Sequence, residues 1–422
     1  MHHQNHFDLV IVGGGTAGTF SAIAAAREGL STAVIEKNSY LGGMATGSGL
    51  TEMNAAGFRE SPLYKGIEKE IFDEMIAEGF AEYHFAVPMS SNKEVKIDRL
   101  RYNPEMLKIL LETKATESGV TLFYQAELDS AEENEDGCIV HARSLYETFT
   151  LTSDYLIDAT GNADLIRKLG CETIKTQADK QLVSTLMFRL SNVDLTKLDA
   201  FIHSEELGKI IQEGYEAGIL KGKILAFTPI PGTKDVSLNV TRAKFDYEDI
   251  RGASMGLAEA RRQILPVYHF VQKRVPGMEA SYIANIASVI GVRDGRRIQG
   301  QYMLTLDDLE QMTNFEDSIA CGCYPMDIHD PVTNSVIWKV LPGVYHIPYR
   351  SLLPKGLHRT LAAGKCLGAE KKAFAAIRVM PIMMNVGESA GYAVALAKCE
   401  KKKLDELTAA SLSQCLTDKY SR

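Results

Sequence analysis

Cysteine pairs are missing from this sequence of 422 residues. It has seven cysteines, an odd count, and no two of them are spaced as a C-x-x-C pair. Disulfide frameworks and zinc sites commonly show such pairs, so we predict neither, and we expect no bound metal. Scattered single cysteines fit a reducing compartment. We therefore expect a cytoplasmic protein.

An excess of basic residues is also missing. The chain has 46 lysines and arginines against 54 acidic residues, which gives a formal net charge of −8. Nucleic acids and anionic membranes are attracted by basic surfaces. Two apolar stretches could be mistaken for membrane-spanning segments. Residues 9–26 contain a glycine cluster, and residues 373–397 contain Arg378, Asn385 and Glu388, which are polar groups that are costly in lipid. We therefore expect neither a nucleic-acid nor a membrane partner.

The N-terminal region has the pattern of a strand, a helix and a second strand. Residues 9–12 are a short apolar run bounded by glycines, which is typical of a buried parallel strand. Residues 16–28 are rich in alanine and show helical spacing, and Gly29 ends this helix. Residues 32–35 are a second apolar run. These elements predict a βαβ unit with a right-handed crossover.

A glycine-rich turn joins the first strand to the helix. Residues 13–18 read GGGTAG and fit G-x-G-x-x-G. Glycine permits the tight turn, the close approach of a pyrophosphate and the close packing of helix on strand, and free N–H groups attract phosphate. Glu36 ends the second strand, where a carboxylate accepts hydrogen bonds from ribose hydroxyls and disfavours a 2′-phosphate. The segment predicts dinucleotide binding.

Two further segments favour FAD over a nicotinamide dinucleotide. The glycine-rich loop of residues 37–49 has few side chains and can lie against a long extended cofactor. Residues 361–397 predict a strand, a glycine turn and a helix begun by Pro381. The positive end of that helix, with Arg378 just before it, suits the N1–C2 edge of a reduced, anionic flavin. No second G-x-G-x-x-G is present, so we predict no separate NAD(P)H domain.

Seven segments carry a resemblance to a known family. They read VIVGGGTAGTFSAIAAAREG, EKNSYLGGMATG, DYLIDATGNADL, GVRDGRRIQGQYMLTLDDL, CYPMDIHD, YHIPYRSLLPKGL and AAGKCLGAEKKAFAAIRVMPIMMNVGESAG. On these segments the chain resembles the FAD-dependent oxidoreductase family, within the glutathione-reductase-like flavoproteins. It departs from the usual family pattern at Asp294 and Gly295, where Glu-Ser is usual.

The resemblance implies a set of cofactor-binding residues. It implies contacts of the glycine turn with the pyrophosphate, of Glu36 with the adenosine ribose, and of the helix after Pro381 with the isoalloxazine ring. The implied set is Gly13, Gly15, Thr16, Ala17, Gly18, Glu36, Lys37, Gly43, Met44, Ala45, Ala159, Thr160, Gly161, Gly364, Met383, Met384 and Asn385.

We expect an α/β fold with two domains. The first is a doubly wound, Rossmann-like FAD-binding domain, formed by residues 1–165 and 345–422. The second is an inserted substrate domain, residues 166–344, with a mixed β-sheet plus helices. Within it, residues 246–275 predict one long helix with a break near Pro266.

Three residues are candidates for the chemistry. His329, in the segment CYPMDIHD, is either a base for neutral pH or a structural histidine. Arg293, with Arg296 three residues later, either clamps an anionic group or forms structural salt bridges. Arg378 is expected to face the cofactor or the substrate.

These expectations lead to one main hypothesis and two alternatives. The main hypothesis is an FAD-dependent oxidoreductase (a dehydrogenase, oxidase or reductase) that transfers hydride or electrons between the flavin and a small organic substrate. The alternatives are a tRNA-modifying flavoprotein and a non-catalytic FAD-binding protein. The sequence specifies no substrate and no oligomeric state.

Overall fold

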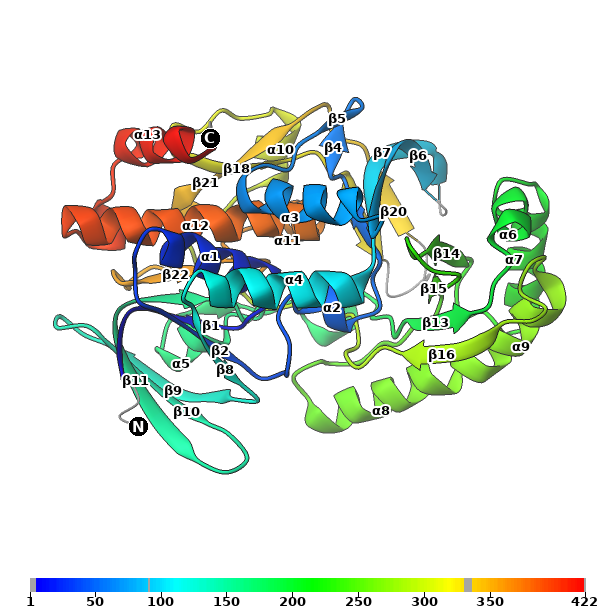
Figure 1. The fold of residues 1–422 in the computed structure, drawn as a ribbon, viewed down its shortest axis with the longest axis horizontal. Coiled ribbons are helices and arrows are strands. Elements are labelled where there is room, and N and C mark those ends of the chain that lie inside the picture. The colour runs from blue at the N-terminus through cyan, green and yellow to red at the C-terminus, as the bar shows by residue number, and fades with distance from the viewer. Residues whose placement is uncertain (1–4, 90–91, 330–335, 421–422) are drawn as a thin grey trace.

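A mainly parallel β-sheet forms the centre of the larger part of the molecule (Figure 1). The computed structural model describes residues 5–89, 92–329 and 336–420. Five strands, β8, β2, β1, β11 and β22, run parallel, and β10 pairs antiparallel with β11 and β9. The expected α/β fold is thereby confirmed. The strands are β1 (His6–Val12), β2 (Thr32–Glu36), β8 (Thr121–Tyr124), β9 (Glu127–Glu133), β10 (Cys138–Arg143), β11 (Thr148–Asp158) and β22 (Thr360–Ala362).

The two faces of this sheet pack into different apolar cores. Leu9 and Ile11 of β1 face the helices, whereas Val10 and Val12 face the hairpin β9–β10, because successive residues of a strand point to opposite faces. A short helix, α5 (Asp164–Lys168), also lies on the hairpin side. The helices on the first side are α1 (Thr16–Arg27), α3 (Gly66–Ala77), α4 (Pro104–Glu117), α12 (Met380–Glu400) and α13 (Ala409–Tyr420).

The two ends of the chain meet where α12 packs on α1 (Figure 1). Glycine allows the close approach, since a Cβ at Gly387 would lie 2.2 Å from the carbonyl oxygen of Ala17. Ser21 Oγ donates to the carbonyl oxygen of Gly387 at 2.7 Å. One turn further on, a Cβ at Gly391 would lie 2.4 Å from the carbonyl oxygen of Ser21, so the helices run in the same direction. The first residues of α12 therefore extend past the start of α1.

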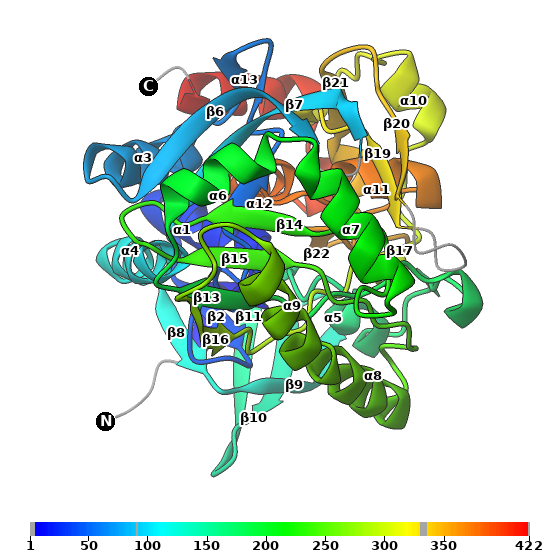
Figure 2. The same cartoon turned by 90° about the vertical axis from the view of Figure 1, so that its right-hand side faces the viewer.

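A second, antiparallel sheet has a core of its own (Figure 2). Its strand order is β14-β15-β13-β16. The predicted long helix is in fact two helices, α8 (Ile250–Arg262) and α9 (Ile264–Arg274), which join at Gln263; Pro266 lies in the first turn of α9, where its missing N–H is tolerated. The predicted domain boundaries stay a prediction. The remaining elements of this part are β13 (Phe188–Ser191), β14 (Ala226–Pro229), β15 (Val236–Asn239), β16 (Tyr282–Ile286), α6 (Leu195–Ile202) and α7 (Glu206–Glu216).

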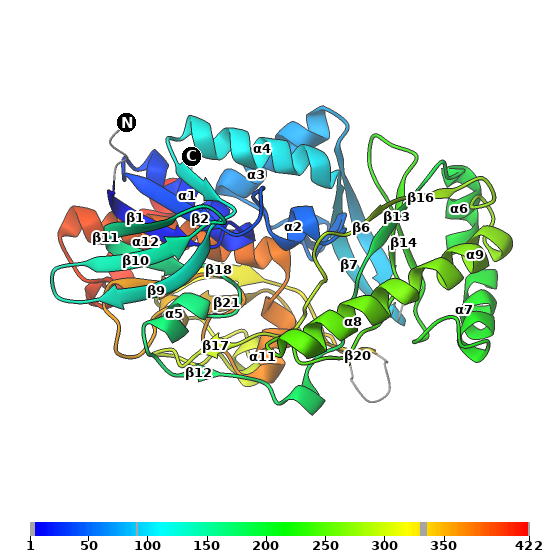
Figure 3. The same cartoon turned by 90° about the horizontal axis from the view of Figure 1, so that it is seen from below.

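Several short sheets complete the fold, and strands β6 and β7 lie between the larger part and the second sheet (Figure 3). The largest is β3-β7-β6, and the pairs β18–β21 and β19–β20 are antiparallel two-stranded sheets. Within the described residues, no helix is long and apolar enough to cross a membrane. The elements not yet given are β3 (Glu52–Asn54), β4 (Gly57–Phe58), β5 (Ser61–Pro62), β6 (Ala81–Met89), β7 (Asn92–Tyr102), β12 (Thr173–Ile174), β17 (Arg297–Ile298), β18 (Ser318–Gly322), β19 (Met326–His329), β20 (Val336–Lys339), β21 (Tyr345–Pro348), α2 (Met44–Gly47), α10 (Leu306–Glu310), α11 (Lys371–Ile377), η1 (Ala178–Lys180), η2 (Tyr349–Ser351) and η3 (Leu404–Glu406).

Candidate active site

The turn between β1 and α1 is shaped by contacts that only glycine allows. Gly13 has a φ of +102°, and a Cβ there would lie 2.5 Å from the carbonyl oxygen of Ala159, just after β11. A Cβ at Gly18 would lie 1.9 Å from the carbonyl oxygen of Gly13. The loop after β2 also passes close to this turn, because a Cβ at Gly43 would lie 2.9 Å from Cα of Gly15. This bare backbone at a helix start fits a pyrophosphate.

Glu36 ends β2 beside this turn and is 5% exposed. Its Oε2 accepts a hydrogen bond from the Gly14 N–H at 2.7 Å. Its Oε1 accepts from the backbone N–H and the Nδ2 of Asn38, at 2.8 and 2.6 Å. A carboxylate has about four lone-pair sites, so one remains for a further donor. The position fits the predicted contact with ribose hydroxyls.

The Glu36→Gln variant should bind FAD about tenfold or more weakly, because charge-assisted hydrogen bonds are worth about 1.5–3 kcal/mol each. Titration of the apoprotein with FAD measures the dissociation constant. Glu78→Gln, which changes an exposed glutamate at the end of α3, is the matched control and should bind FAD normally. Equal affinities for the two variants would mean that the Glu36 carboxylate does not contact the cofactor.

One cavity brings the loop after β2 together with the start of α12 and the candidate chemical residues. It has a volume of about 220 Å³. Met44 and Ser48 come from the loop side, and Val379 and Met380 from the start of α12. The other lining residues are Leu50, Glu52, Asn54, Met89, Thr185, Met187, Ile224, Ala226, Asn239, Gly291, Val292, Arg293, Tyr324, Asp327, His329, Val336, Trp338, Lys365 and Arg378.

β19 presents Asp327 and His329 to this cavity, because residues i and i+2 of a strand share a face. His329 Nε2 lies 3.2 Å from Asp327 Oδ1. The other carboxylate oxygen, Oδ2, accepts a hydrogen bond from the Tyr324 hydroxyl at 2.9 Å. A carboxylate at this distance favours a proton on Nε2, which would leave Nδ1 as the acceptor. The approach is an ion-pair distance rather than a formed hydrogen bond, since Asp327 Oδ1 has no hydrogen-bond partner among the described residues.

Burial and charge keep His329 neutral and Asp327 ionised. Burial, followed by the charge of Arg293, lowers the pKa of His329 to about 3. Burial alone would raise the pKa of Asp327, but the contact with His329 and the charges of Arg378 and Arg293 hold it below its usual range. At neutral pH the imidazole therefore has an unprotonated nitrogen that can accept a proton, but a pKa of about 3 makes it a weaker base than an ordinary histidine.

Arg378 lies between α11 and α12 and lines the same cavity. Its Nη2 donates to the carbonyl oxygen of Asp327 at 3.3 Å and lies 3.5 Å from Asp327 Oδ2. The side chain is 11% exposed. Arg378 therefore contacts the same carboxylate as His329. This carboxylate balances part of the positive charge of Arg378. That it faces the cofactor or the substrate stays a prediction.

Arg293 enters the cavity from the segment before β17. Its Nη1 donates to the carbonyl oxygen of Val183 at 2.6 Å and to Thr185 Oγ1 at 2.9 Å. Both partners are uncharged. Arg293 is therefore held in place by uncharged partners, and the acidic side chain whose charge acts on it is Asp327.

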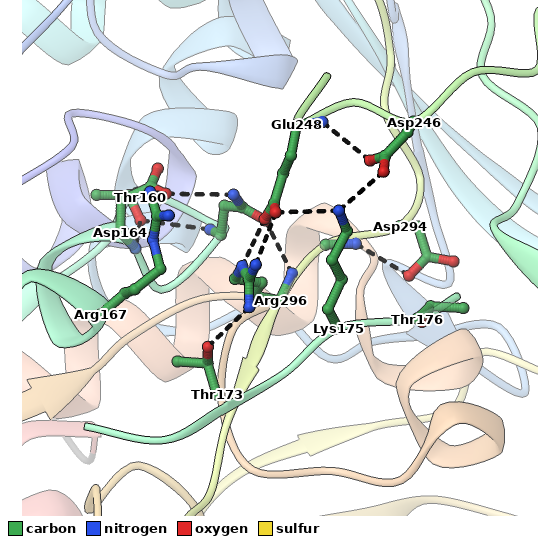
Figure 4. Close-up of polar contacts among 12 residues, drawn as sticks. Thr160, Asp164, Arg167, Thr173, Lys175, Thr176, Asp246, Glu248, Asp294 and Arg296 are labelled. Carbon is green, nitrogen blue, oxygen red and sulfur yellow. Dashed lines mark hydrogen bonds and ion pairs between the residues drawn. The ribbon is translucent and has the colours of Figure 1, made fainter. Parts of the chain in front are cut away.

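Arg296 has different partners, so the two arginines form no common clamp. Figure 4 shows it in an ion-pair network that joins residues 173–175 to residues 246–248. Its Nη2 donates to Glu248 Oε2 at 2.7 Å, and Lys175 Nζ lies 3.1 Å from the same oxygen. Lys175 also bonds Asp246 at 2.9 Å. Arg296 thus has the structural role that was its alternative.

Three of the predicted cofactor residues follow β11 at the glycine turn. Ala159 contacts the turn as described, and Thr160 Oγ1 donates to Asp158 Oδ1 at 2.7 Å before the chain turns at Gly161. Gly364, with a φ of +122°, would place a Cβ 3.4 Å from Cβ of Ala17 at the start of α1. Thr16 is the first residue of α1, Lys37 is exposed after β2, and Ala45 is buried in α2.

The predicted residues of α12 lie away from the cavity. Met383 and Met384 are 3% and 0% exposed and pack in the helical core. Asn385 Nδ2 donates to Glu68 Oε2 on α3 at 2.8 Å. None of these three is among the described residues that line the cavity. Their contact with a cofactor stays a prediction.

The sequence reasoning missed Asp327, Tyr324 and Thr185. The D-x-H spacing in CYPMDIHD is a usable signal for Asp327, because such spacing on a strand places both side chains on one face. Tyr324 and Thr185 carry no comparable signal. They reach the site through the fold.

The sequence profile of a family described as FAD dependent oxidoreductase matches residues 8–416. The chain belongs to the FAD-dependent oxidoreductase family. This confirms the predicted family, enzyme class and FAD cofactor. The soluble pyridine nucleotide transhydrogenase of Vibrio atlanticus (strain LGP32) is 44% identical to this oxidoreductase over 46 residues, which are 11% of this chain and 10% of that protein. The chain therefore matches about a tenth of the length of its curated relatives.

Solved structures resemble this FAD-dependent oxidoreductase over nearly its whole length. The flavin-dependent brominase Bmp2 has a TM-score of 0.50 at 14% identity, with 98% of this chain and 83% of that chain covered. The p-nitrophenol 4-monooxygenase PnpA from Pseudomonas putida DLL-E4 has a TM-score of 0.50 at 11% identity, with 99% and 85% covered. At such identities the likeness concerns the fold alone.

Proposed function

We propose that this protein exchanges a hydride between FAD and a small organic substrate, and that the cavity around His329 is its active site. The observation that supports this is the cavity itself, which combines the His329–Asp327 pair with Arg293, Arg378 and the start of α12. The resemblance to the family implies that the isoalloxazine ring lies at that helix start. Substrate, base and cofactor would then meet in one place.

The residues of the β1–α1 turn fit the adenine-nucleotide half of FAD. A Cβ at Gly13 or Gly18 would close the turn, and the Glu36 carboxylate keeps a free lone pair. When bound, FAD supplies the hydride and electron chemistry. The protein supplies binding, orientation and proton transfer.

His329 would accept a proton from the substrate at Nδ1 during oxidation and return it during reduction. Asp327 keeps the imidazole in the tautomer that leaves this nitrogen free, so it is a positioning residue. Apolar side chains at one side of the cavity, such as Met89, Met187 and Trp338, reduce the access of water.

Both alternatives have less support. A non-catalytic FAD-binding protein gains nothing from a buried neutral imidazole beside an ionised carboxylate. A tRNA-modifying flavoprotein needs a surface that attracts phosphates, and the net charge is −8. We also infer a cytoplasmic location, because all seven cysteines are free thiols.

The purified protein should be yellow, should release FAD on denaturation, and should lose its visible flavin band under anaerobic conditions when its substrate is added. The Gly13→Val variant is the control and should lack FAD, because its side chain would meet the carbonyl group of Ala159. A folded preparation with FMN or without flavin would contradict the cofactor assignment. A flavin that exchanges electrons with no small organic compound in either direction would contradict the proposed reaction.

A further inference from the structure

Two arginines share one hydroxyl group at the wall of the cavity. Thr185 Oγ1 lies 2.9 Å from Nη1 of Arg293 and 3.0 Å from Nη1 of Arg242. Arg242 also approaches Asn239 Oδ1 at 3.4 Å, and Thr185 and Asn239 both line the cavity. Arg293 is thus at the cavity surface, and Arg242 lies directly behind it.

The described residues balance the positive charge of this pair only in part, because the one acidic side chain whose charge acts on both, Asp327, also pairs with Arg378. Neither Arg242 nor Arg293 has an acidic ion-pair partner among them, and the buried Nη2 of Arg242 has no hydrogen-bond partner there. Burial lowers the pKa of Arg293 to about 9 and that of Arg242 to about 10, values at which both remain cations at neutral pH.

The acidic side chains that line the cavity are already paired. Glu52 Oε2 lies 3.2 Å from Arg99 Nη1, and Asp327 contacts His329 and Arg378. A buried, uncompensated charge is costly, and a guanidinium recognises a carboxylate with short, charge-assisted hydrogen bonds. An anionic ligand would therefore complete this site.

We propose that the substrate couple is a hydroxycarboxylate and the corresponding oxocarboxylate, with the carboxylate bound by Arg293 and favoured by the charge of Arg242. This inference rests on the proposed function and names the substrate class of the same site. An amino acid is disfavoured, because its ammonium group would enter a cavity whose unpaired side chains are cationic.

The reaction balances with the groups already named. In the oxidative direction the carbinol C–H bond breaks and its hydride goes to FAD, while the O–H bond breaks and its proton goes to His329. The carbinol carbon becomes a carbonyl carbon, so the substrate loses two electrons and FAD gains two. The carboxylate is unchanged, and its contact with Arg293 keeps the carbinol group near the base.

Calorimetric titration of the FAD-loaded protein tests the binding part. The probe is α-hydroxyisobutyrate, a hydroxycarboxylate without a transferable hydride, and its uncharged amide is the control ligand. The acid should bind and the amide should bind about tenfold or more weakly. Arg293→Gln and Arg242→Gln should weaken binding of the acid by a similar factor. Arg262→Gln removes the same charge from an exposed position of α8 and should leave binding unchanged.

The result that would overturn the inference is equal binding of acid and amide by the wild type, a comparison that needs no variant to fold. Equal binding of the acid by Arg293→Gln and Arg262→Gln would overturn it too. Anaerobic bleaching separates this inference from the proposed function. Bleaching by uncharged alcohols but not by hydroxy acids would overturn the substrate class alone. Selective binding of the acid without any flavin reduction or reoxidation would overturn the reaction alone.

Discussion

The His329→Gln variant should turn over its substrate about 10²- to 10⁴-fold more slowly than the wild type while FAD stays bound, because a positioned general base contributes this range. Glutamine keeps a polar side chain of similar length but cannot take up a proton at neutral pH. Steady-state kcat and the flavin content of the purified variant measure the two parts of this prediction.

His346 offers a matched control for that experiment. It is the histidine of β21, its Nδ1 lies 3.2 Å from Ser318 Oγ, and it does not line the cavity. His346→Gln should therefore leave kcat within about twofold of the wild type, as expected for a substitution away from the chemistry. If both variants turned over at the wild-type rate, His329 would be a structural histidine.

The same assignment predicts the acid side of the pH profile. The pKa of His329 is lowered to about 3, so the imidazole is neutral and able to accept a proton at every pH above that value. An ordinary histidine base would lose activity below about pH 6.5. Here kcat/KM should show no such loss down to about pH 5. A fall with an apparent pKa near 6.5 would show that His329 titrates normally.

The dinucleotide turn could be predicted from the sequence because its physics is local. The turn, the start of α1 and Glu36 are joined by one βαβ unit, so spacing along the chain fixes their positions. The structure places the Glu36 carboxylate beside this turn, where it accepts from the Gly14 N–H, and its contact with ribose stays a prediction. The contact of α12 with α1 is long-range, and the close approach at Gly387 and Gly391 becomes visible only in the structure.

The arginines show why the rest could not be predicted. Arg293 and Arg296 are three residues apart and equally polar, yet the first meets Thr185 and the second meets Glu248. Only the tertiary positions of those partners decide between ligand and salt bridge. Arg242 has no motif at all, and it reaches the site because β15 ends beside β13.

The family resemblance implies that Asn385 lies at the flavin. The structure directs its side chain to Glu68 on α3, a partner 317 residues away in the sequence. One helical turn further along α12, Glu388 accepts hydrogen bonds from the Ile67 N–H, at 3.2 and 3.1 Å to its two oxygens. Two carboxyl groups thus lie buried between α3 and α12, at 1% and 0% exposure.

These carboxyl groups should make the protein less stable as the pH rises. Burial raises the pKa of Glu388 from 4.5 to about 7, and burial together with Glu388 raises the pKa of Glu68 well above 4.5. A raised pKa in the folded state means that the folded protein holds this proton more tightly than the unfolded chain does. The resulting contribution to the free energy of unfolding is fully present below pH 4.5 and is lost as the pH rises through about 7. For Glu388 the free energy of unfolding falls by about 3 kcal/mol, because each pKa unit corresponds to about 1.4 kcal/mol.

Glu388→Gln should therefore remove most of this loss. Glutamine keeps an oxygen that can accept from the Ile67 N–H, and it cannot ionise. Urea unfolding of the FAD-saturated protein at about pH 5 and pH 8 gives the change in the free energy of unfolding for each protein. The decrease in the free energy of unfolding between the lower and the higher pH should be about 2–3 kcal/mol smaller in Glu388→Gln than in the wild type. Glu78→Gln, exposed at the end of α3, should keep the wild-type decrease. The same decrease in Glu388→Gln would mean that Glu388 is ionised in the folded protein throughout this range, and that its charge is compensated by Lys65 and Arg27, the cations that act on it.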